Sequence, residues 1–130
     1  MKYTDLTKLQ RAVYRQLGSD NFQEFFETLQ DVANHGAGGG FSGFMHYGET
    51  VEFTRRNRAE ILAQLKEDAD SFGFSVADMV CAFNCFKGYD ADEILSALYG
   101  GRGDSVTTVY NGLAWYALES VASQLDGVNA

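Results

Sequence analysis

No proline occurs in the 130 residues, so nothing interrupts a helix by ring geometry and glycine has to make the turns. Six apolar stripes with helical spacing follow one another, and a glycine comes at or near the end of each. They predict helices over about 6–17, 20–35, 57–72, 75–87, 90–99 and 105–125. We therefore expect an all-α fold: one compact domain over 1–130, with five to six helices and a glycine-rich loop at 36–48.

Capping residues precede several of these stripes, which strengthens the helical interpretation. The predicted caps are Ser19 or Asp20, Asn57 with Glu60, Ser75 with Asp78, and Asp90 with Glu93. The third stripe consists of Ile61, Leu62, Leu65, Ala69 and Phe72, which are expected to face the core. Alternation typical of a strand is found at most in GFMHY, residues 43–47.

Length and composition are those of one ordinary globular domain, with 45% hydrophobic and 22% charged residues. No apolar run approaches the roughly 20 residues of a membrane span, and the start MKYTDLTKLQ lacks the apolar core of a signal peptide. Two cysteines suit a reducing compartment better than a disulfide framework. We expect a protein of the cytoplasm that does not bind a membrane.

The net charge of −8 disfavours direct binding of nucleic acid, which requires lysine and arginine, and allows association with a basic partner. The charges are unevenly spread. Residues 19–52 hold six acids and no lysine or arginine, and residues 67–93 hold seven acids against Lys87 alone. Two short basic blocks, 1–18 and 53–66, alternate with these acidic blocks.

Residues 34–48, NHGAGGGFSGFMHYG, contain both histidines and six of the 14 glycines. The Gly-x-Gly-x-x-Gly pattern at 38–43 matches a dinucleotide-binding loop, but that motif requires a preceding strand, and here a helix precedes it. The aromatics Phe41, Phe44 and Tyr47 could stack on bases, although acids on both sides favour a role in pinning the loop to the helices. We interpret the segment as a structural connection.

Zinc is the main alternative that uses these histidines, since a Cys₂His₂ set is available in His35, His46, Cys81 and Cys85. The ten residues between the histidines do not fit the usual spacing, and cysteine often behaves as a small buried hydrophobe. A Cys–His nucleophile is disfavoured because Cys85 lies late in its predicted helix. We expect core thiols, no metal, no cofactor and no catalytic residue.

Two further patterns have ordinary explanations. Arg102-Gly103-Asp104 matches a cell-adhesion tripeptide, but in a chain without a secretion signal it predicts a turn before a helix. Paired carboxylates such as Asp68/Asp70 and Asp90/Asp92 lie in polar runs, which favours a solvated helix surface over acid–base chemistry.

Four segments occur in an order that resembles a family of small uncharacterised acidic proteins from bacteriophage and plasmid accessory regions. They are ANHGAGGGFSGFMHYGETVEF (33–53), AFNCFKG (82–88), EILSALYG (93–100) and TVYNGLAWYALESVA (108–122). The family has no established catalytic residues to carry over. Proteins of this kind look enriched in inhibitors of host defence, including anti-CRISPR proteins, so the resemblance implies a bacterial host cell and a non-enzymatic inhibitor.

An inhibitor of this kind can act because a defence complex must keep a basic DNA-binding groove, which an acidic surface can occupy. The leading hypothesis is therefore an anti-CRISPR protein that binds an effector complex and blocks DNA binding. The candidate contact strips are Glu24, Glu27 and Asp31 on one helix face, and Glu67, Asp68, Asp70, Asp90, Asp92 and Glu93. A small helical interaction or regulatory protein unrelated to defence and a zinc-stabilised module stay as alternatives, and monomer and homodimer are both left open.

Overall fold

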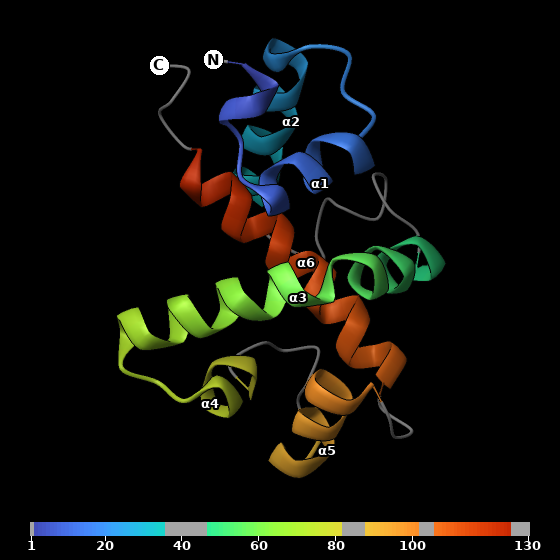
Figure 1. Cartoon of the computed structure of the whole chain (residues 1–130), viewed down its shortest axis with the longest axis vertical. Coiled ribbons are helices and arrows are strands. Elements are labelled where there is room, and N and C mark those ends of the chain that lie inside the picture. Colours follow the sequence, from blue (N-terminus) through green and yellow to red (C-terminus); the bar gives the residue numbers. More distant parts are fainter. Residues whose placement is uncertain (1, 36–46, 82–87, 102–105, 126–130) are drawn as a thin grey trace. The chain divides into compact units, whose positions relative to one another are not determined.

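The computed structural model describes residues 2–35, 47–81, 88–101 and 106–125, and all its regular elements in these ranges are helices (Figure 1). This confirms the all-α prediction. In chain order the elements are η1 (Tyr3–Asp5), α1 (Lys8–Gln16), α2 (Phe22–His35), α3 (Tyr47–Phe72), α4 (Val76–Cys81), α5 (Ala91–Leu95), η4 (Ser96–Gly100) and α6 (Val106–Gln124). Element η4 is one turn of π-helix that continues directly from α5.

The chain forms two compact units, and helices α3 and α6 each contribute residues to both. The first unit comprises 1–49 and 115–130, and the second comprises 50–114. The second unit therefore holds most of α3 together with α4, α5, η4 and the first half of α6. Each unit is described separately below.

In the first unit, a capping box starts α1: Gln10 N–H donates to Thr7 Oγ1 at 3.2 Å, and Thr7 N–H donates to Gln10 Oε1 at 3.0 Å. Gln10 Nε2 also donates to Gln124 Oε1 at 2.9 Å, which joins α1 to the end of α6. The Tyr14 ring lies 4.8 Å from that of Phe25, centroid to centroid, and packs α2 against α1.

In the second unit, the buried side of α3 carries Ile61, Leu65 and Ala69, as its apolar stripe predicts. Ile94 of α5, Leu98 of η4, and Val109 and Leu113 of α6 are also fully buried in this unit. Burial of such aliphatic side chains is the main stabilising term for a helical unit of this size.

Three polar contacts add specific geometry to this core. Thr54 Oγ1 donates to the Tyr110 carbonyl and Thr50 Oγ1 donates to Asn111 Oδ1, both at 2.6 Å, so α3 is held against the first half of α6. Arg58 Nε donates to the Leu98 carbonyl of η4 at 2.7 Å. The guanidinium group of Arg58 thus provides a donor for a helical carbonyl inside the unit.

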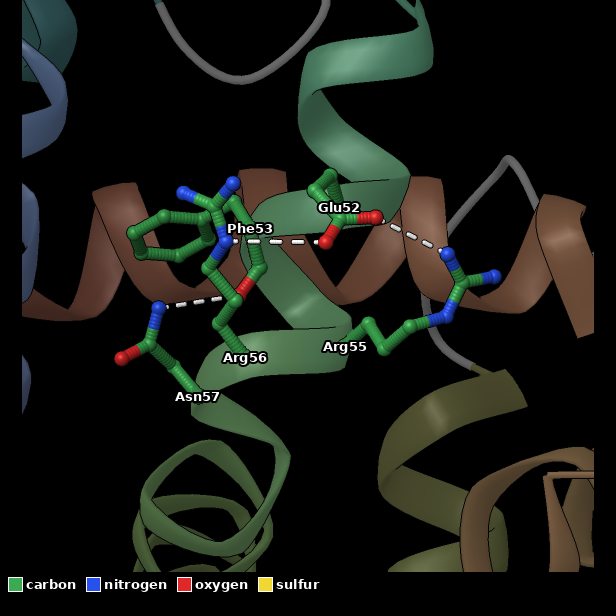
Figure 2. A network of polar contacts seen from close by, with 5 residues as sticks. All are labelled: Glu52, Phe53, Arg55, Arg56 and Asn57. Atoms are coloured by element: carbon green, nitrogen blue, oxygen red, sulfur yellow. Dashed lines mark hydrogen bonds and ion pairs between the residues drawn. The ribbon is translucent and has the colours of Figure 1, made fainter.

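Helix α3 begins at Tyr47, before the predicted start, but two helical segments meet in a kink at Asn57, where φ is −116° and ψ is 20°. The second segment therefore starts where the sequence predicts, and the segment from Tyr47 to the kink was not predicted. Figure 2 shows that Asn57 Nδ2 donates to the Phe53 carbonyl at 2.9 Å, so the side chain provides a donor to this carbonyl at the bend. A residue suited to a cap can therefore sit at a bend.

The other predicted helix ends are confirmed in part. Gly18, Gly73 and Gly101 have φ of +66°, +73° and +63° and follow helices, as expected of terminal glycines. Ser75 Oγ accepts from Asp78 N–H at 3.0 Å, so that cap is confirmed. The predicted cap of α2, Ser19 or Asp20, is wrong by one or two residues, because the Glu24 N–H donates to Asn21 Oδ1 at 2.9 Å.

Asp90 occupies the predicted cap position of α5, but its side chain makes no capping hydrogen bond. Residues 36–46 of the glycine-rich segment, including His46 and most of GFMHY, lie outside the described residues, as do Cys85 and the 102–104 tripeptide.

Candidate protein-binding surface

Three carboxylates lie in the last two turns of α3, just before the helix ends at Phe72. Glu67 and Asp70 are exposed and share the helix face opposite the buried stripe. Asp68 lies on the flank of the helix and is half-buried, and its Oδ1 accepts a hydrogen bond from Gln64 Nε2 at 2.9 Å. The sequence therefore places a dense negative charge at one helix end.

The position of these acids is electrostatically unfavourable for the helix. The carboxyl end of a helix carries partial negative charge, and the last turn of α3 contains no basic residue. The nearest cation along the helix, Lys66, lies with its Nζ 5.5 Å from the centroid of the Tyr99 ring, a cation–π contact with the end of η4. Local helix stability therefore does not explain why Glu67 and Asp70 stand at this end, whereas Asp68 has a local partner in Gln64.

The acids of α5 occupy the opposite kind of position. Asp90 is the N-cap residue, and Asp92 and Glu93 lie in the first turn, where the partial positive charge of the helix favours carboxylates. All three are exposed. In Figure 1 this helix start and the C-terminal end of α3 lie apart within the second unit, with α4 between them in the view. The six residues thus occupy two helix ends rather than one continuous strip.

The strip on α2 lies in the first unit and follows one exposed helix face. Glu24, Glu27 and Asp31 are all exposed, on the side away from the buried Phe25 and Leu29. Glu24 belongs to the first turn, a favourable place for a carboxylate, and Glu27 Oε1 accepts from Gln23 Nε2 at 3.3 Å.

The basic residues around the middle of α3 are engaged in local contacts. Figure 2 shows Glu52 between two arginines: Oε2 lies 2.9 Å from Arg55 Nη1, and Oε1 lies 3.5 Å from Arg56 Nε. With Arg58 bonded to Leu98 and Lys66 placed over Tyr99, each cation of the 53–66 block has a partner within the second unit. In the described part of the chain, no base forms an ion pair with the exposed Glu67 or Asp70.

The proposed zinc ligands cannot be placed as a set. His46 and Cys85 lie outside the described residues, and so do the side chains of His35 and Cys81. Within the described ranges, no group of three or more His, Cys, Asp or Glu side chains has the arrangement of a metal site. None of the helices in these ranges is long and apolar enough to cross a membrane.

The match to a protein family covers almost the whole chain. A model described as "Domain of unknown function (DUF7222)" matches residues 7–128. The chain belongs to the DUF7222 family. No curated protein and no solved structure matches it.

In this DUF7222 chain, one feature of the surface differs from the sequence-based expectation. Phe72 was expected to face the core, but it is 66% exposed, and Phe74 just beyond it is 52% exposed. The expectation was wrong because helical spacing defines a face but not how far neighbouring elements extend along it. A stripe residue immediately before the terminal glycine, with a second phenylalanine directly after that glycine, was the available signal.

Proposed function

We propose that the protein is a non-enzymatic inhibitor that binds the basic DNA-binding surface of a bacterial defence complex, a CRISPR effector, and blocks access of DNA. The observation that carries the proposal is the group of carboxylates at the end of α3: Glu67 and Asp70 are exposed near a helix end whose dipole disfavours negative charge, and Asp68 lies between them in the sequence. A surface that is costly for the fold is a candidate for a role in binding.

The charge of the chain supports the same mechanism. The net charge is −8, and the arginines near the middle of α3 are occupied by Glu52 and by the Leu98 carbonyl. Carboxylates of fixed spacing on a helix can compete with DNA phosphates for lysine and arginine on a partner. The α2 strip of Glu24, Glu27 and Asp31 offers a second contact of the same chemistry in the other unit.

The resemblance to phage and plasmid accessory proteins supplies the cellular context for this proposal. Their setting makes a host defence complex the natural basic partner. The acids of α5 have a sufficient local explanation in the first turn of their helix, so they are not needed as contacts. This difference gives the experiment an internal control.

The test is capture of the tagged protein from bacteria that express CRISPR effector complexes, with partners identified by mass spectrometry. A recovered effector is then titrated with labelled target DNA in the presence of three proteins: wild type, E67Q/D68N/D70N and D90N/D92N/E93Q. Both variants replace two aspartates and one glutamate, so their net charges are equal.

We expect the wild type and the α5 variant to displace DNA and the α3 variant to lose at least about tenfold in potency, as three charge contacts imply. Equal losses for both variants would assign the effect to net charge rather than to the end of α3. Capture of no effector would contradict the proposal and favour a regulatory protein unrelated to defence. Circular dichroism must show unchanged helix content for both variants.

A further inference from the structure

Two phenylalanine side chains stack on each other in solvent at the end of α3. The rings of Phe72 and Phe74 lie 6.2 Å apart, centroid to centroid, with 26° between their planes. Their exposed fractions, 66% and 52%, are the largest of any large hydrophobic side chain in the described part of the protein. Exposed aromatic area of this kind is unfavourable in water and is enriched where proteins bind one another.

The backbone holds this pair in a defined geometry. Gly73, between the two rings, has φ +73°, and its N–H donates to the Asp70 carbonyl at 3.2 Å. The Phe74 N–H donates to the Ala69 carbonyl at 2.9 Å, which completes a Schellman motif. Ala69 is buried in the core of the unit, so the turn is tied to the core. Little ordering of backbone remains to be done when a partner binds.

The charge beside the rings identifies the chemistry of the partner. Asp68 lies one helical turn before Phe72, so the two side chains are neighbours on the helix surface, and the hydrogen bond from Gln64 Nε2 at 2.9 Å orients the Asp68 carboxylate. Glu67 and Asp70 add negative charge on the exposed face of the same two turns. A guanidinium group can stack on an aromatic ring and bind a carboxylate at the same time, which an ammonium group does less well.

We propose that Phe72 and Phe74, with Asp68 beside them, form a docking surface for an arginine-bearing segment of a partner protein. The inference rests on the proposed function for its basic partner and adds an aromatic anchor to it. A membrane is the less favourable occupant, because three carboxylates at this helix end repel anionic headgroups.

The probe is a fluorescein-labelled peptide of alternating arginine and glycine, compared with its lysine–glycine counterpart by fluorescence anisotropy. The wild type is expected to bind the arginine peptide more tightly than the lysine peptide. F72L/F74L keeps apolar side chains but removes the rings, and it is expected to weaken arginine binding about tenfold and to abolish the preference. D90N/D92N, which removes charge from the start of α5, where the acids are not needed as contacts, is expected to keep the preference.

Three outcomes would overturn the inference. The first is an arginine preference that survives in F72L/F74L. The second is a dimer of the wild type, measured by sedimentation, that is replaced by a monomer in F72L/F74L, when the wild type shows no preference for the arginine peptide. The rings would then contact a second copy. The third is binding of the wild type to phosphatidylcholine vesicles that is lost in F72L/F74L, when the wild type shows no preference for the arginine peptide.

The peptide assay contains no component of a defence complex, so the two proposals can fail separately. Ring-dependent arginine binding by a protein that leaves effector–DNA binding unchanged would retain the docking surface and contradict the defence role. Displacement of DNA by both wild type and F72L/F74L, with no peptide preference, would retain the defence role and contradict the docking surface.

Discussion

The C-terminal end of α3 and the N-terminal end of α5 each carry three acidic residues, in opposite electrostatic settings. Each has two aspartates and one glutamate within four residues. On α5, the carboxylates lie at the cap and in the first turn, where the helix dipole favours them. On α3, they lie in the last two turns without a basic residue in the last one.

This difference separates acids that stabilise the start of a helix from acids, Glu67 and Asp70, that the dipole of their helix end disfavours. The two groups have the same density of acidic residues along the sequence, so that density does not distinguish them. Their positions relative to a helix end do. The α3 group also ends beside the exposed pair Phe72 and Phe74, and α5, all of whose residues are described, has no large exposed hydrophobic side chain. The end of α3 is therefore the better candidate for a binding surface.

The largest expected effect tests whether the end of α3 is as rigid as its turn implies. Gly73→Ala places a Cβ at φ +73°, and we expect the free energy of unfolding to fall by about 1–2 kcal/mol. Nothing lies within 4 Å of the new Cβ, so the cost comes from the backbone conformation alone. Urea unfolding followed by circular dichroism measures it.

Gly48→Ala at the other end of α3 is the matched control. Gly48 is the second residue of the helix, is not among the glycines of positive φ, and also has open space where the alanine methyl group would lie. The free energy of unfolding should rise by up to about 1 kcal/mol there, because alanine restricts the unfolded chain. A similar result at both positions would mean that the end of α3 does not need its left-handed turn.

Neutralising the two acidic groups should change stability in opposite directions. D90N/D92N removes two favourable charges from the start of α5 and is expected to lower the free energy of unfolding by about 1 kcal/mol. E67Q/D70N removes two unfavourable charges from the end of α3 and is expected to raise it by about 0.5 kcal/mol. Thermal and urea unfolding at low ionic strength give both values.

The sign of each change in the free energy of unfolding, rather than its size, decides whether the two acidic groups differ in their effect on the fold. If E67Q/D70N destabilises the protein, those carboxylates make contacts that support the fold, and their position no longer points to a binding role. If D90N/D92N has no effect, the first turn of α5 does not depend on its charges. The α5 group would then be as available for binding as the α3 group.

Much of the fold could be predicted because helix ends are determined locally in the sequence. The terminal glycines Gly18, Gly73 and Gly101 and the Ser75 cap could each be recognised from the residue itself. Asn57 likewise marks the kink at which the second segment of α3 begins, but the first segment, from Tyr47, could not be placed in this way because it is held by tertiary contacts such as Thr54 to Tyr110. The capping box that starts α1 has a local sequence signal too, but it was not among the predicted caps.

Only part of the candidate surface could be predicted from the sequence. The acids and their order could be read directly, and Gly73 already indicated that Glu67, Asp68 and Asp70 precede a helix end. The exposure of Phe72 could not be read, because it depends on where the neighbouring elements stop. The stacking of Phe72 on Phe74 likewise requires the two hydrogen bonds around Gly73.

The smallest expected effect uses salt to test whether the contrast between the two helix ends is electrostatic. The screening length falls from about 10 Å at 0.1 M salt to about 3 Å at 1 M, so the charge–dipole interaction should largely vanish. The stabilities of E67Q/D70N and D90N/D92N should then approach that of the wild type to within about 0.3 kcal/mol. The Gly73→Ala deficit is conformational and should persist at 1 M salt. A contrast between the acidic groups that survives high salt would arise from packing or hydrogen bonds at those residues, and the helix-dipole explanation would no longer distinguish them.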